Sequence, residues 1–246
     1  MAKTLLELIN EVGKNLRRST GSTYTAIDQN ADSIFIMQAI NEAKRQVEGA
    51  WKWDCLRETI TFASVGGTRS YDLGDAGVVV TGNPARDRSY VAHTARHHLQ
   101  FWDQTADSEY RLTECPRDYA EHIATIDPDT DIERPSLVAI HPNSDGLEVR
   151  FPWAPTGVRT YKVEIYNPQD DLAVAGTTLT VPWRPVVLAA TALCFDERGE
   201  ELGGASSLWW SRFDDSLSRE IGRDATAFDM QLIADTNYDT AGYWNA

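Results

Sequence analysis

The sequence predicts an α+β protein, in which a helical bundle built from both ends of the chain carries an inserted, mostly antiparallel β-domain. Three observations predict it. Apolar residues recur at helical spacing near both ends, they alternate with polar residues through the middle, and turn residues separate the alternating runs. We therefore assign 1–53 plus 182–225 of the 246 residues to the bundle, 54–181 to a small β-barrel or sandwich, and 226–246 to an extended C-terminal tail.

Two helices are predicted before residue 53. Thr4 and Glu7 have the spacing of a capping box, and the apolar residues that follow share one face: Leu5, Ile9, Val12 and Leu16. The second helix begins near Asn30 or Asp32, and its apolar stripe is Met37, Ile40, the stem of Lys44, Val47 and Trp51. Its other faces carry Asn41, Glu42, Arg45 and Glu48. Because neither helix can bury its stripe alone, we expect an antiparallel pair.

Short strands are predicted through the middle of the chain. Leu56, Ile60 and Phe62 alternate with polar residues, and Gly66-Gly67 then leads to 70–73, which we interpret as the second strand of a hairpin. Further runs with strand character are 78–81, 90–92, 135–141, 147–151 and 158–166. Turn residues occupy 143–146, and 116–123 is predicted to be a short helix.

Helical periodicity returns at Pro182. Pro182 and Pro185 stand where a helix begins, 186–197 is rich in alanine and leucine, and Gly199 stops it. A last helix is predicted over 206–223, with one apolar side: Trp210, Phe213, Leu217 and Ile221. Residues 226–246 are polar and acidic, with too little apolar periodicity to fold alone.

Charge and cysteine content narrow the function. The 37 acidic and 23 basic residues give a net charge of −14, whereas proteins that grip DNA phosphates are normally basic. The acidic charge is still compatible with a surface along which DNA slides without sticking.

Three scattered cysteines, Cys55, Cys115 and Cys194, indicate neither a zinc ribbon nor a disulfide framework. The N-terminus does not resemble a signal peptide and no run could span a bilayer, so we expect a soluble protein that folds in a reducing cytoplasm.

No motif indicates catalysis, a cofactor or a metal. Phosphate-binding, nucleophile-elbow and zinc-protease motifs are all absent, and we expect no enzyme, although a glycosidase carboxylate pair is left open. His93, His97 and His98 cluster, with Glu109 or Glu114 as the only guesses for a third ligand. We interpret them as exposed histidines on a loop.

One acidic loop has a superficial likeness to a calcium site. Asp127, Asp129 and Asp131 match the opening of an EF-hand loop, but Ile132 and Val138 stand where it needs glycine and glutamate. A solvated acidic loop is the better interpretation.

Aromatic residues supply the candidate partner-binding residues among the eight tryptophans and nine tyrosines. Trp209 and Trp210 are adjacent and point in different directions on a helix, so one faces the bundle and the other faces solvent, the β-domain or a neighbouring subunit. The tail has nothing local to bury its aromatic residues, which we interpret as anchors that dock on a partner rather than as a loose terminus. The candidates are therefore Trp209, Trp210, Tyr238, Tyr243 and Trp244.

Several stretches resemble the head-to-tail connector adaptors of tailed bacteriophages, including tail tubular protein A-like and head completion adaptors. They are TLLELINEV, INEAKRQVEGAWKWD with LRETITF, and RPSLVAIHPNSDGLEVRFPWAP followed by YKVEIYNPQDDL and TTLTVPWRPVVLAATALCFDERGE. The resemblance covers about residues 4–225 and is looser over 75–130.

The resemblance implies a structural virion protein, made in the host cytoplasm and placed at the head–tail junction. There it forms a ring, commonly of twelve copies, around a channel for DNA. The implied partners are the portal protein, a downstream tail or nozzle protein and further copies of the chain, and the C-terminal tail would reach the portal. No cofactor and no membrane are implied.

Two alternatives from other classes remain. The β-domain could recognise a carbohydrate or a host receptor, with Trp102, Trp153 or Tyr166 as stacking platforms, or the chain could be a glycan-cleaving tail enzyme. Both would act as a monomer or trimer and respond to glycans, whereas an adaptor assembles with a portal.

Overall fold

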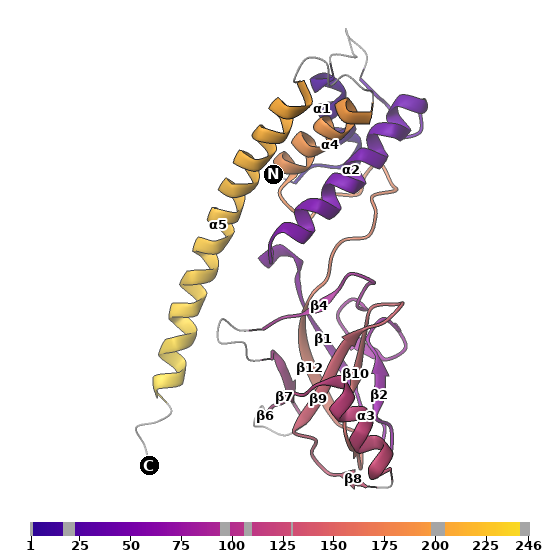
Figure 1. The fold of residues 1–246 in the computed structure, drawn as a ribbon, viewed down its shortest axis with the longest axis vertical. Coiled ribbons are helices and arrows are strands. Elements are labelled where there is room, and N and C mark those ends of the chain that lie inside the picture. The colour runs from indigo at the N-terminus through magenta and orange to yellow at the C-terminus, as the bar shows by residue number, and fades with distance from the viewer. Residues whose placement is uncertain are drawn as a thin grey trace. The chain divides into compact units, whose positions relative to one another are not determined.

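The computed structural model describes residues 2–16, 23–93, 99–105, 110–128, 130–197 and 205–241, with backbone alone for 205 and 227–241. The fold is α+β, as predicted (Figure 1). It divides into two compact units. The helical unit comprises Met1–Cys55 and Gln169–Ala246, and the β-unit comprises Leu56–Pro168.

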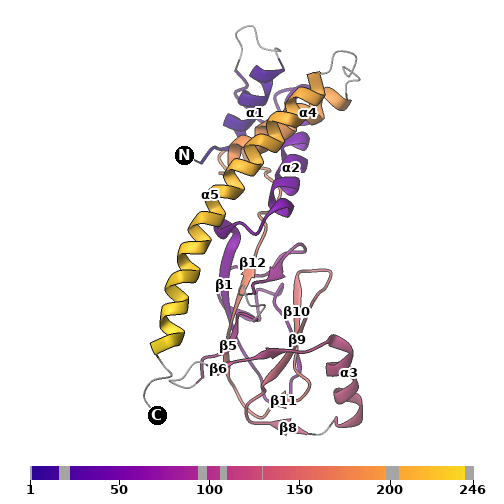
Figure 2. The same ribbon diagram turned by 60° about the vertical axis from the view of Figure 1, so that its left-hand side comes forward.

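The helical unit is built from both ends of the chain. Its helices are α1 (Leu5–Asn15), α2 (Ala31–Ala50), α4 (Trp183–Glu197) and α5 (Ala205–Ala241). Helix α4 contacts the other three (Figure 2), and most of its apolar residues are buried. The predicted capping box is confirmed, because the Thr4 hydroxyl accepts the Glu7 N–H and the Glu7 carboxylate accepts the Thr4 N–H. Asn30 caps α2 in the same way, and the apolar stripe predicted for α1 is buried.

The chain returns to the helical unit earlier than expected. We placed the end of the β-domain at residue 181, but the β-unit ends at Pro168. Residues 175–179 then run along the start of α1, where the Leu5 N–H donates to the Thr177 carbonyl and the Leu179 N–H donates to the Lys3 carbonyl, both at 2.9 Å. These backbone groups therefore find their partners at the N-terminus of the chain and the first turn of α1 rather than in a sheet.

Helix α2 buries two charged groups that we expected to reach solvent. Lys44 and Glu48 are both buried, with Nζ and Oε1 3.4 Å apart. Both side chains also form hydrogen bonds with the backbone of Gln169 in the returning chain. The Lys44 ammonium donates to the Gln169 carbonyl, and the Gln169 N–H donates to the Glu48 carboxylate at 3.1 Å. Glu48 was expected on a polar face and Lys44 to bury only its stem. Both expectations were wrong because the returning chain covers this face of α2.

The β-unit is a pair of sheets with a shared core. Its larger sheet has the order β3-β1-β12-β5-β6, with β4 also paired to β12. These strands are β1 (Arg57–Ala63), β3 (Val79–Thr81), β4 (Tyr90–Val91), β5 (Phe101–Asp103), β6 (Tyr110–Arg111) and β12 (Thr160–Tyr166). The smaller sheet has the order β2-β10-β9-β7, from β2 (Ser70–Asp72), β10 (Leu147–Arg150), β9 (Leu137–Pro142) and β7 (Thr113–Glu114). A parallel pair, β8 (Asp131–Ile132) with β11 (Ala154–Pro155), completes it.

Aromatic rings fill the space between the two sheets. Both sheets contribute to one buried cluster, within which five rings lie in mutual contact: Phe62, Tyr71, Phe101, Phe151 and Tyr161. The β9–β10 turn over 143–146 is confirmed, and Gly146 has a φ of +147° that a side chain would strain. The predicted short helix is α3 (Arg117–Ile126), and a 3₁₀ turn, η1 (Asp54–Leu56), precedes β1.

The predicted hairpin around Gly66-Gly67 was wrong. Strand β1 has β12 on one side and β3 on the other, so both of its edges are occupied. Strand β2 instead pairs with β10 in the smaller sheet. The turn crosses between sheets, and the buried Tyr71 holds it by accepting the Val65 N–H at 3.0 Å.

Helix α5 is longer than expected and continues beyond the other helices of its unit (Figures 1 and 2). We expected an extended tail over 226–246, but the backbone is helical to Ala241. Glycine and proline are absent from 224–241, so the backbone there meets no residue that stops a helix. None of the described helices combines the length and apolar character needed to cross a membrane.

Candidate functional site

Trp210 fastens α5 to α4. Its indole N–H donates to the Asp196 carboxylate at 2.8 Å, and its ring lies edge-on to the buried Phe213 with centroids 5.6 Å apart. Trp210 is therefore the member of the predicted tryptophan pair that faces the bundle.

A second contact fastens α5 about four turns later. The Asp224 carboxylate accepts the Trp51 indole N–H at 2.8 Å and the Asp54 backbone N–H at 3.4 Å. The segment of α5 between Trp210 and Asp224 is thus held at both ends. Whatever lies along its inner side is presented on a fixed scaffold.

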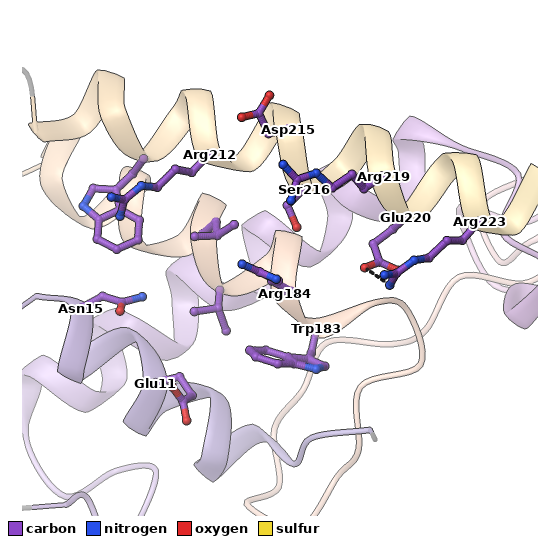
Figure 3. A pocket seen from close by; sticks show the side chains of 13 residues that line it. Glu11, Asn15, Trp183, Arg184, Arg212, Asp215, Ser216, Arg219, Glu220 and Arg223 are labelled. Atoms are coloured by element: carbon purple, nitrogen blue, oxygen red, sulfur yellow. Dashed lines mark hydrogen bonds and ion pairs between the residues drawn. The ribbon is translucent and has the colours of Figure 1, made fainter.

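A groove of about 500 Å³ lies along this held segment, between α5 and the helices α1 and α4 (Figure 3). One face of α5 lines it with residues at intervals of three and four: Trp209, Arg212, Ser216, Arg219 and Arg223. Helix α4 contributes Trp183 and Arg184, and α1 contributes Glu11. In Figure 3 Arg184 lies in the middle of the groove, with Arg212 and Arg223 toward its ends.

A second hollow continues the groove within the helical unit. It has a volume of about 560 Å³ and shares four lining residues with the first, Trp183, Arg184, Glu220 and Arg223. We call the two together the arginine groove, defined by Trp183, Arg184, Trp209, Arg212, Arg219 and Arg223.

The arginine groove is lined by four arginines and by four carboxylates, Glu11, Asp215, Glu220 and Asp224. Three of these carboxylates have partners: Glu11 lies 3.0 Å from Lys3, Glu220 lies 3.0 Å from Arg223, and Asp224 accepts the Trp51 indole N–H. The hydrogen bond from Lys3 lowers the pKa of Glu11, so this carboxylate stays ionised at neutral pH. Arg184, Arg212 and Arg219 form no ion pair with any described residue, and Arg212 lies over the ring of Trp209, with its Cζ 4.8 Å from the centroid.

The two tryptophans of the groove are partly exposed and carry cations on their faces. Lys3 Nζ lies 3.9 Å from the ring centroid of Trp183, and Arg212 stacks on Trp209. The stacked cations favour an anionic ligand, because a guanidinium already stacked on a ring can bind a carboxylate at its edge. The arrangement can therefore bind an acidic segment.

The structure brings only part of the predicted partner-binding set together. Trp209 lies in the arginine groove and Trp210 beside it. Tyr238 lies on α5, where the backbone alone is described, and Tyr243 and Trp244 lie outside the described residues. Their role stays a prediction.

The β-unit gives little support to the predicted alternatives. Tyr166 is buried and stacks on Tyr90, with centroids 5.0 Å apart, so it offers no free face to a sugar. Trp102 lies between Arg111 and Lys162, and Trp153 is partly buried.

The two metal-like motifs are only partly described. His93 Nε2 lies 2.9 Å from Glu114 Oε2, while His97, His98, Glu109 and Asp129 fall outside the described residues. In the part of the chain that the structure describes, no three His, Cys, Asp or Glu side chains are placed to hold a metal ion.

Sequence reasoning missed the arginine groove. We followed the apolar side of α5, and the arginines lie on the neighbouring face. Their spacing, 212, 219 and 223 with Trp209 one turn before, was the signal that could have identified it.

Comparison with known proteins gives one family. The sequence model described as SU10 adaptor protein matches residues 3–234, which include the whole β-unit and most of the helical unit. A search of curated proteins finds no match.

Proposed function

Because this chain belongs to the SU10 adaptor protein family, a phage adaptor family, we propose that it is the head-to-tail adaptor of a tailed bacteriophage. The family makes it a structural virion component that interacts with other virion proteins. The finer proposal is a ring, of twelve copies, between the portal protein and a downstream tail or nozzle protein. The match across both units is the observation that carries it.

Subunit-to-subunit contact in a ring requires two different patches on each copy. The helical unit offers two candidates at separate places along α5. One is the arginine groove near the start of the helix, with Trp209 in it and Trp210 fixing its wall. The other is the end of the helix and the residues after it, with Tyr238, Tyr243 and Trp244.

The charge of the chain supports the proposed channel. Twelve copies at −14 each make a strongly acidic ring, and an acidic wall repels the phosphates of DNA in transit. Genomic DNA would then pass without tight binding.

Electron microscopy of the purified virion tests the proposal directly. We expect ring density at the head–tail junction into which the helical unit and the β-unit each fit. Mixing the purified chain with its portal ring should reproduce that ring, and the isolated chain is expected to be a monomer. Absence of the chain from the junction would contradict the proposal.

Deletion of residues 226–246 tests the role of the end of α5. This deletion leaves the helical contacts of Trp51, Trp210 and Asp224 in place, so we expect a folded subunit that no longer joins the particle. Unchanged incorporation of the shortened chain would reject the docking role.

A further inference from the structure

Three arginines of the groove have no ion-pair partner among the described residues. The helical unit has 12 basic and 20 acidic residues, so acidic partners are plentiful within it. Nevertheless Arg184, Arg212 and Arg219 form no ion pair with a described residue, although they lie within one groove. An exposed, unpaired cluster of cations in an acidic protein indicates a site for an anionic ligand.

One segment of the same chain has the complementary chemistry. Lysine and arginine are absent from residues 224–246, and Asp229, Asp235 and Asp239 alternate there with aromatic and aliphatic residues. Tyr243 and Trp244 follow. Carboxylates suit the arginines, and aromatic rings suit the edges of Trp183 and Trp209, whose faces carry Lys3 and Arg212.

That segment cannot fill the groove of its own chain. Arg223, the last groove residue on α5, and Ala241, the end of the helix, are 18 residues apart. At a rise of about 1.5 Å per residue they are separated by ~27 Å. Trp244 is three residues beyond Ala241, and three extended residues reach back only about 10 Å. The occupant must come from another molecule.

We propose that the arginine groove of one copy binds the acidic, aromatic residues 229–244 of a second copy. The inference rests on the proposed ring and names its subunit contact. The contact is heterologous, since a groove on one copy receives a different segment of the next. It gives each copy one donor segment and one receiving groove, and a ring closes when the last donor meets the first groove.

A peptide-binding measurement tests the contact without a ring. The probe is a fluorescent, C-terminally amidated peptide with the sequence of residues 226–246, added to the full chain and followed by anisotropy. We expect saturable binding, weakened about tenfold or more by Arg184→Glu with Arg219→Glu. Lys52→Glu is the matched control, because Lys52 is an exposed cation of the same unit outside the groove. It should leave affinity unchanged.

Charge exchange adds a readout that misfolding cannot imitate. A peptide with Asp235→Lys and Asp239→Lys should bind the doubly substituted chain better than the original peptide does. Absence of binding to the unmodified chain, or equal loss in the Lys52→Glu chain, overturns the inference.

Crosslinking in the assembled ring identifies the natural occupant. With a photoreactive amino acid in place of Trp244, we expect crosslinks to α4 or α5 of a neighbouring copy. Crosslinks to the portal protein alone would overturn the inference while leaving the proposed adaptor role intact. Displacement of the peptide by a short DNA duplex would assign the groove to DNA instead. Failure of the chain to assemble with its portal at all would instead contradict the proposed function, whatever the peptide does.

Discussion

The two units of this chain use their arginines differently. In the β-unit every described arginine contacts a carboxylate, a backbone carbonyl or an aromatic ring of the same unit. Arg159 and Arg134 both reach the buried Asp103, at 2.9 and 3.3 Å, and Arg69 donates to three carbonyls. In the helical unit, Arg184 and Arg219 have no such partner among the described residues. The described arginines of the β-unit are thus held by contacts within it, although buried side-chain atoms of Arg134, His141 and Tyr161 have no hydrogen-bond partner there. In the helical unit, two arginines of the groove stay exposed and without such contacts among the described residues.

The cores of the two units also differ in the kind of side chain that fills them. The β-unit closes around an aromatic cluster from both sheets. The helical unit places a buried ion pair between α2 and the returning chain. Loss of a ring from an aromatic cluster removes apolar contacts, whereas loss of one member of a buried ion pair leaves the other charge uncompensated. Four substitutions, in order of decreasing expected effect, test this difference.

Phe62→Ala should produce the largest loss of stability. Phe62 is fully buried and contacts the rings of Tyr71, Phe101 and Tyr161, and removing such a ring costs about 4 kcal/mol. Urea unfolding should show the β-unit unfolding first while the helical signal at 222 nm persists. Val80→Ala, at an exposed position of the edge strand β3, is the control and should be nearly neutral. A single shared transition would show that the units do not unfold independently.

Lys44→Met should destabilise the helical unit by about 3 kcal/mol, because Glu48 is left as an uncompensated buried charge. Replacing both residues, Lys44→Met with Glu48→Leu, should recover much of that loss. The exposed pair of Arg45 with Asp171 is the comparison, and Asp171→Asn should cost less than about 1 kcal/mol. Chemical unfolding followed by circular dichroism measures all three. A larger loss for the double variant than for Lys44→Met would reject the buried-pair explanation.

Trp210→Phe should cost about 1.5 kcal/mol, since the hydrogen bond to Asp196 is lost. Trp209→Phe should change stability less, because Trp209 is a groove residue, and should instead weaken binding of the 226–246 peptide. Thermal unfolding and the anisotropy assay separate the two effects. If the two variants lost the same stability and the same peptide affinity, Trp210 and Trp209 could no longer be assigned separate roles in stability and in binding.

Glu7→Gln should have the smallest effect, and the effect should depend on pH. Hydrogen bonds from Thr4 hold the pKa of Glu7 below its ordinary value of 4.5. A carboxylate with a lowered folded-state pKa stabilises the fold above its unfolded pKa, and that contribution disappears as the pH falls through the folded value. The variant should therefore melt slightly earlier than the original at pH 7, and the difference should shrink as the pH falls below 4.5 through the lowered pKa of Glu7. A difference that does not change with pH would point to packing rather than charge.

Local patterns were enough to predict most elements. The Thr4–Glu7 capping box, the Asn30 cap, the turn over 143–146 and the strands around Ile60 and Val163 all follow from spacing and turn chemistry within a few residues. The predictions that were wrong concern contacts between residues far apart in the chain. Pairing of β2 with β10 overrode the local hairpin signal, and the chain returning at Gln169 converted Lys44 and Glu48 from surface to core.

Only part of the candidate site could be predicted from the sequence, namely the tryptophan pair. Adjacent tryptophans necessarily point in different directions, so one of them had to face outward. That the outward side carries unpaired arginines depends on α4 and α1 lying opposite α5, which no local pattern encodes.

The chain enters the β-unit on β1 and leaves it on β12, and these two strands are hydrogen-bonded neighbours with Arg57 opposite Tyr166. Entry and exit therefore lie about 5 Å apart. A recombination that exchanged everything between them for another sheet with adjacent first and last strands would leave the path of the helical frame unchanged. The helical unit and the inserted β-unit could then be exchanged separately between related proteins, because replacing one would not require changes in the other.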